Sequence, residues 1–277
     1  MSRSFEVAGS ADLAGSADLA AAAVGSGPEP AARGRRWAWL LAAGWLVQAG
    51  LRAWLSRAQT VPLAIPDESA YLIAARVFAG GAPANFSYST LYPAGYPLLI
   101  TPVFWFTHNP VTVYHAVLLG INAPISALVM PLGYVAGRRL GLERAWAFGV
   151  AMVAALLPAA LFYSQYAMTD AIYPVLVLAW LLAVHSWLTA RSVRGQYLAA
   201  VGSALLAGYA YAVHSRGAVM VAGFVLVGVV VAWRRLVLRG TALAALVALC
   251  LPLGAARLLN HHLSSVMYPS GARTLAS

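Results

Sequence analysis

The chain has 277 residues, of which 61% are hydrophobic and only 9% are charged. Soluble globular domains carry about 25% charged residues, so this composition excludes an ordinary soluble protein and predicts an all-α, polytopic membrane protein. The formal charge of +10 arises from 18 basic residues, all of them arginine. In a membrane protein such an excess indicates cytoplasmic loops and contact with anionic membrane lipids, and no nucleic-acid partner is expected.

The N-terminal region, residues 1–33, is of low complexity. The sequence Ala-Gly-Ser-Ala-Asp-Leu occurs at 8–13 and again at 14–19. Few residues here are able to build a core, which predicts a disordered cytoplasmic tail. The membrane core is expected over residues 34–259, and a polar tail outside the cytoplasm is expected over residues 260–277.

Seven segments of the core are apolar and are expected to span the membrane as helices. These segments are 37–55, 111–136, 146–162, 172–188, 197–213, 218–233 and 243–259. Arg33, Arg35 and Arg36 precede the first segment, which places the N-terminus of this multi-pass cell-membrane protein in the cytoplasm. Pro124 and Pro131 predict kinks in the second segment.

The first predicted outer loop covers residues 56–110 and contains further elements. Asp67–Ala79 has apolar residues at helical spacing, which predicts a short interfacial helix that ends at Gly80-Gly81. Tyr92-Pro93-Ala94-Gly95-Tyr96-Pro97 is rich in turn-forming residues. Leu98–Phe106 is apolar but too short to span, so it is expected at the membrane interface.

Acidic residues are scarce in the apolar part of the chain. Most of the 8 acidic residues lie in the N-terminal tail or in a basic loop, which leaves Asp67, Glu68 and Asp170 for the core. Because acidic groups near a bilayer are costly, each of them is a candidate for a functional site. In the predicted topology these three residues and Arg216 share the extracytoplasmic face.

This group of side chains is suited to a transfer reaction. Asp67, with Glu68 beside it, can act as general base toward an acceptor hydroxyl. Arg216 can hold a phosphate through charge-assisted hydrogen bonds, and the nearby His214 can touch the same phosphate. The alternatives are structural, with the acidic residues capping helices and Arg216 reaching from a surface turn toward water.

Four stretches of the sequence resemble the membrane-embedded glycosyltransferases of the GT-C type. They are Pro66-Asp67-Glu68, Tyr92-Pro93-Ala94-Gly95-Tyr96-Pro97, Met168-Thr169-Asp170 and Ser215-Arg216-Gly217. That superfamily includes the dolichyl-phosphate-mannose protein mannosyltransferases and the aminoarabinose transferases. It often has Thr-Lys-Gly where this chain has Ser-Arg-Gly.

The resemblance implies a role for each matching residue. Asp67 would be the base, Glu68 its neighbour, Asp170 the second acidic residue of the pocket and Arg216 the phosphate contact. Tyr92 and Tyr96 are expected to line the substrate site. The partners would be a polyprenyl-phosphate-linked sugar and a lipid, glycan or protein acceptor, with inversion at the sugar carbon.

Two other functions are compatible with the sequence. One is a transporter or flippase-like protein for a lipid or a small anion. The other is a non-catalytic or split fragment whose missing spans come from a second chain, since GT-C enzymes usually have more spans. No cofactor and no metal site is predicted, because His261-His262 lacks a third ligand nearby and Cys250 is the single cysteine. A divalent metal is left open.

Overall fold

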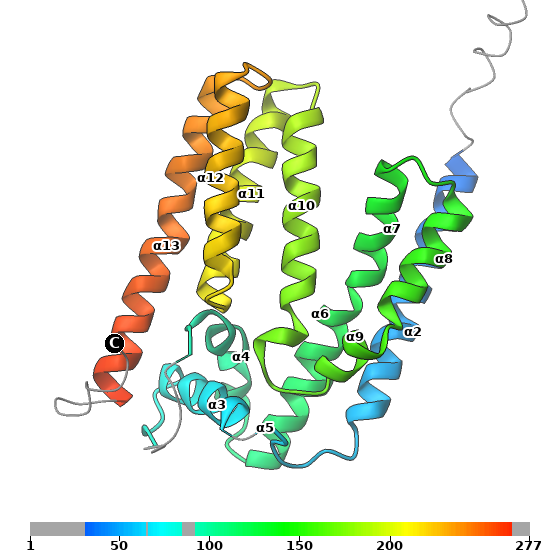
Figure 1. Ribbon diagram of the computed structural model, residues 1–277. Coiled ribbons are helices and arrows are strands. Elements are labelled where there is room, and N and C mark those ends of the chain that lie inside the picture. The colour runs from blue at the N-terminus through cyan, green and yellow to red at the C-terminus, as the bar shows by residue number, and fades with distance from the viewer. Residues whose placement is uncertain (1–30, 65, 85–91, 268–277) are drawn as a thin grey trace, which may run out of the picture. The chain divides into compact units, whose positions relative to one another are not determined.

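The computed structural model describes residues 31–64, 66–84 and 92–267, and every regular element in these ranges is a helix (Figure 1). This confirms the predicted all-α class. The chain divides into two units, 1–41 and 42–277. The first unit contributes the beginning of α2 (Ala31–Ser56) to the described residues. The predicted disordered tail lies outside them except for residues 31–33, which belong to α2.

Three of the described helices are long and apolar enough to cross a membrane. They are Pro110–Arg139, α11 (Val193–Val213) and α13 (Arg239–Met267). Shorter apolar helices of 10–17 residues account for several of the other predicted spans. The structure is therefore compatible with a membrane protein, whereas the predicted seven crossings are not confirmed.

The helix Pro110–Arg139 is irregular near its middle. It consists of α5 (Pro110–His115), a π-helical segment η1 (Ala116–Asn122), α6 (Ala123–Ala127) and α7 (Val129–Arg139). Pro124 lacks an N–H group, so the regular ladder of hydrogen bonds is interrupted just after η1. The irregularity expected at Pro124 thus takes the form of a π-helix, which places the amide of Asn122 in the interior.

The predicted span over residues 146–162 is a broken helix. α8 (Arg144–Ala155) ends before Leu156-Leu157, and α9 (Pro158–Tyr163) begins at a proline. The freed carbonyl of Ala155 accepts a hydrogen bond of 2.7 Å from Nη2 of Arg52. The side chain of Arg52 is fully buried and lies at the negative end of the α8 dipole.

Four helices form a packed layer in the second half of the chain (Figure 1). α10 (Tyr173–Thr189), α12 (Gly217–Trp233) and α13 each contact α11. The side of α11 buried in this core carries alanines, among them Ala200, Ala204 and Ala207, which allow close helix approach. The C-terminal end of α11, the α11–α12 turn and the beginning of α10 meet at the end of this layer that also lies beside α4.

α13 continues past the predicted boundary at residue 259. Leu263 is fully buried and packs in one cluster with Ala74, Val77 and Ala94. Asn260 adds a hydrogen bond of 2.9 Å from the Ala94 N–H to its Oδ1 atom. The first part of the predicted polar tail is therefore helical and packed, and residues 268–277 lie outside the described residues.

The predicted interfacial helix is present as α3 (Asp67–Phe78), followed by Gly80 with φ 85°. α4 (Gly95–Phe106) contains the short apolar segment together with part of the turn-rich stretch. α3 packs against α4, and α4 contacts α11. Gly95 is required at this contact, because a Cβ atom there would lie 2.5 Å from the backbone carbonyl of Ala212.

Substituting Gly95→Ala is expected to lower the thermal stability of the protein in detergent. The added methyl group must displace the α11 backbone, and overpacking of this kind costs about 1–3 kcal/mol. Gly202→Ala on α11 is the matched control, since a Cβ atom there meets nothing within 4 Å. Scanning fluorimetry of both variants measures the effect. Equal midpoints for the two variants would show that the α4–α11 contact is not as close as described.

Candidate functional site

Asp67 opens α3 directly after Pro66, and its carboxylate is half-buried. Oδ1 accepts a hydrogen bond of 2.6 Å from the hydroxyl of Tyr92. Oδ2 has no hydrogen-bond partner in the described part of the chain. The carboxylate is thus oriented through one oxygen, and the other is free to accept a proton or a hydrogen bond.

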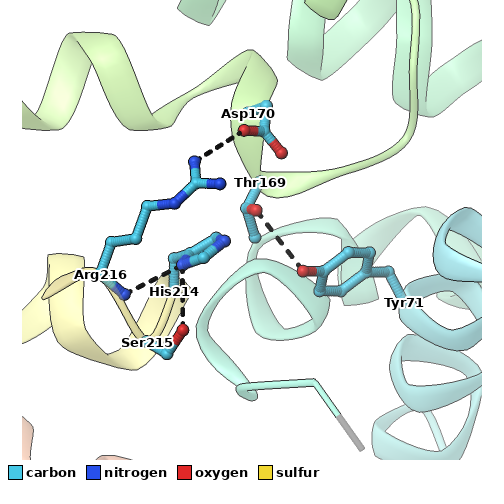
Figure 2. A network of polar contacts seen from close by, with 6 residues as sticks. All are labelled: Tyr71, Thr169, Asp170, His214, Ser215 and Arg216. Carbon is cyan, nitrogen blue, oxygen red and sulfur yellow. Dashed lines mark hydrogen bonds and ion pairs between the residues drawn. The ribbon is translucent and has the colours of Figure 1, made fainter. Parts of the chain in front are cut away.

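Asp170 and Arg216 form an ion pair between two other elements (Figure 2). Asp170 lies in the 3₁₀ turn η2 (Thr169–Ala171), and Arg216 is the N-cap residue of α12. A single contact of 3.4 Å joins Nη1 of Arg216 to Oδ1 of Asp170, and the side chains are 68% and 24% exposed. An ion pair with so long an N–O distance and such exposed side chains contributes little to the stability of the fold. Most of the hydrogen-bond donors of the guanidinium are therefore available to an anionic ligand.

Tyr71 connects Asp67 with the ion pair. Its ring centroid lies 4.8 Å from that of Tyr92, which holds Asp67. Its hydroxyl lies 3.5 Å from Oγ1 of Thr169, the residue before Asp170 (Figure 2). Burial raises the pKa of Tyr71, and the charges of Asp170 and Asp67 raise it further. The phenol of Tyr71 therefore stays neutral. Asp67 and Asp170 make no direct contact with each other among the described residues.

The turn that carries Arg216 is held by His214. The Nδ1 atom of His214 accepts a hydrogen bond of 3.0 Å from the Arg216 N–H, and the Ser215 hydroxyl lies 3.3 Å from the same nitrogen. At Gly217 a Cβ atom would overlap the backbone of Tyr211, so this residue type permits the sharp entry into α12. The turn directs the Arg216 side chain toward η2 (Figure 2).

The acceptor role of His214 requires an unprotonated Nδ1, which makes the turn sensitive to acid. Burial, followed by the charge of Arg216, lowers the pKa of His214 from 6.5, although Asp170 acts in the opposite sense. The stabilisation is complete above pH 6.5 and is lost as the pH falls below that value toward the lowered pKa.

We therefore expect amides of the turn at Arg216 to lose protection from hydrogen exchange as the pH falls below 6.5, after correction for intrinsic exchange. His214→Asn keeps a side-chain acceptor that does not titrate, so its exchange should stay constant over the same range. A loss of protection that is equal in both proteins would assign the effect to another group.

Glu68 differs from Asp67 because its carboxylate is fully buried. Oε2 accepts hydrogen bonds from the N–H groups of Leu63 and Ala64 at 2.7 and 2.8 Å. Oε1 accepts bonds from the hydroxyl of Tyr114 and the N–H of Ala167 at 2.7 and 2.6 Å. This geometry favours a role in positioning over the catalytic role expected from the sequence.

Tyr96 also supports the site from the interior. It was expected to line the substrate site, but it has no exposed surface. Its ring packs edge-on against Tyr71 at a centroid distance of 5.3 Å, and its hydroxyl donates to Oδ1 of Asn122 at 2.9 Å. Asn122 was not among the residues selected from the sequence, although it is an amide in an apolar run, which often marks an interhelical contact.

The two histidines considered as metal ligands lie far along α13. His262 stacks on Phe78 at a centroid distance of 6.3 Å, and His261 is exposed. No group of three or more His, Cys, Asp or Glu side chains suited to a metal occurs among the residues described. The polar side chains at this site are those of Asp67, Asp170, Arg216 and His214.

No protein family model, no curated protein and no solved structure matches the chain at a significant level. The resemblance to GT-C glycosyltransferases consequently remains a prediction from the motifs alone.

Proposed function

We propose that the chain transfers a sugar from a polyprenyl-phosphate-linked donor to an acceptor hydroxyl on the outer face of the cell membrane. The observation that carries the proposal is the arrangement around Tyr71. On one side lies Asp67, whose Oδ2 atom has no hydrogen-bond partner among the described residues, and on the other lies a largely exposed guanidinium, Arg216. A base and an anion-binding group are the groups that an inverting displacement requires.

In the proposed reaction Oδ2 of Asp67 accepts the proton of the acceptor hydroxyl. The acceptor oxygen forms a bond to the anomeric carbon as the bond between that carbon and the donor phosphate oxygen breaks. The electron pair leaves with the phosphate, and the guanidinium of Arg216 stabilises the negative charge that develops there. Asp170 holds Arg216 through one weak contact before the phosphate arrives.

The expected lipid donor agrees with the composition of the chain. A polyprenyl phosphate enters from the bilayer, and its headgroup lies at the depth of the membrane surface. The proposed topology has seven spans, with Asp67, Asp170 and Arg216 on the extracytoplasmic side. A transporter of the same lipid would also need a phosphate contact, but it would move the lipid intact and would not release polyprenyl phosphate from the sugar.

The test is a transfer assay with the full chain in liposomes. Labelled polyprenyl-phosphate sugars are supplied together with a membrane extract as the source of acceptors. We expect labelled sugar in the acceptor fraction and an equal amount of released polyprenyl phosphate. Movement of intact labelled lipid between leaflets without release would support the transporter instead. If neither sugar transfer nor lipid movement is observed, both functions are rejected for this chain acting alone.

A further inference from the structure

We propose that Glu68 and Asn122 are positioning residues that clamp one peptide group, between Tyr166 and Ala167, and thereby fix Asp170 opposite Arg216. The clamp itself follows from the contacts of the described residues. Its consequence for turnover depends on the proposed function.

The two sides of this peptide group are held by different side chains. The carbonyl of Tyr166 accepts a hydrogen bond of 2.6 Å from Nδ2 of Asn122, and the N–H of Ala167 donates to Oε1 of Glu68 at 2.6 Å. Glu68 and Asn122 are both fully buried. In such an environment hydrogen bonds are strong and costly to break, so the peptide plane is held in one orientation.

Each clamp residue is in turn held by further groups. Asn122 accepts from the Tyr96 hydroxyl at 2.9 Å, which leaves its amide nitrogen directed at the Tyr166 carbonyl. Glu68 accepts from the Tyr114 hydroxyl at 2.7 Å and from two backbone N–H groups at its other oxygen. The clamp therefore joins α3, α4, α5 and η1 to one point of the loop before α10.

Tight turns transmit this fixed point to Asp170. The Met168 N–H donates to the Tyr166 carbonyl at 2.8 Å, and the Ala171 N–H donates to the Met168 carbonyl at 3.3 Å. Asp170 lies between these residues in η2. Arg216, in contrast, has a 68% exposed side chain. The carboxylate is thus the fixed member of the ion pair, and the guanidinium is the member that can move to a phosphate.

The clamp is tested by hydrogen exchange of the full chain in nanodiscs, which needs no activity. Asn122→Asp keeps the acceptor for Tyr96 but replaces the donor to the Tyr166 carbonyl with an oxygen. We expect exchange in residues 164–171 to rise at least about tenfold, with α11 unchanged. Ser126→Ala is the matched control, because Ser126 is buried on the adjoining turn and bonds only locally, to Ala123. Wild-type exchange in Asn122→Asp would overturn the clamp.

The positioning role is tested by a double-mutant cycle on sugar transfer. Asn122→Asp is expected to lower kcat about 10–100-fold with KM for the lipid donor unchanged within about threefold, because a misplaced group costs turnover. In an Asp170→Asn background the same change should cost less than about twofold. An equal loss in both backgrounds would overturn action through Asp170. If the wild-type chain transfers no sugar, the proposed function fails, and the exchange result alone decides the clamp.

Discussion

Substituting Asp67→Asn is expected to lower sugar transfer by about 10²–10⁴-fold, the range typical of a lost general base. The asparagine oxygen can still accept the hydrogen bond from Tyr92, so the local structure should be kept. The amide cannot accept the proton of the acceptor hydroxyl. Transfer rates at saturating donor measure the loss, and thermal midpoints of the two proteins verify that the variant is folded.

Glu143→Gln is the control for Asp67→Asn. Glu143 is an exposed acidic residue before α8, outside the proposed site. It should transfer sugar at the wild-type rate, which separates the role of Asp67 from a general effect of removing one negative charge. If Asp67→Asn retained the rate of this control, Asp67 would not be the base.

Substituting Arg216→Gln is expected to weaken binding of polyprenyl phosphate about 10–100-fold, which is the range for losing charge-assisted hydrogen bonds. Within the part of the chain that the structure describes, the guanidinium of Arg216 has one long contact, to Asp170, which uses little of its hydrogen-bonding capacity. Arg216→Lys keeps the charge but not the planar fork, and should lose less. Equilibrium binding to protein in nanodiscs measures both variants.

Arg57→Gln provides the matched control for this measurement. Arg57 is exposed, is expected on the same face, and contacts the ring and the carbonyl of Trp54. It adds the same charge to the surface but is not part of the proposed phosphate site. Equal losses for Arg57→Gln and Arg216→Gln would indicate nonspecific attraction of the anionic lipid to a basic surface.

Much of the fold could be predicted from local sequence signals. The helix from Asp67 and its end at Gly80 follow from acidic residues at the beginning, helical spacing and a glycine with positive φ. The sequence also placed Asp170 and Arg216 on the same face of the membrane. Because few other charged residues are expected on that face, an ion pair between these two could be predicted. Such signals depend on composition and on neighbours along the chain.

The supporting contacts could not be predicted in the same way, because they join residues far apart in sequence. The burial of Arg52 depends on the carbonyl of Ala155, which has no helical donor because α8 ends there and Pro158 begins a new helix. From the sequence, Glu68 was expected to act beside Asp67 in the catalytic group. Two of its four donors, the N–H groups of Leu63 and Ala64, are local. The other two, the Tyr114 hydroxyl and the Ala167 N–H, are far away in sequence and reach Glu68 only in the folded chain.

The most direct test of the proposed transfer site is the release of polyprenyl phosphate from a polyprenyl-phosphate sugar by the wild-type chain and by Asp67→Asn. Both proteins should bind the donor equally, since Arg216 is present in each. The proposal predicts release coupled to sugar transfer by the wild-type chain and release lower by at least about 10²-fold in the variant. Equal release by the two proteins, or none by the wild-type chain with a full set of sugars and acceptors, would contradict it.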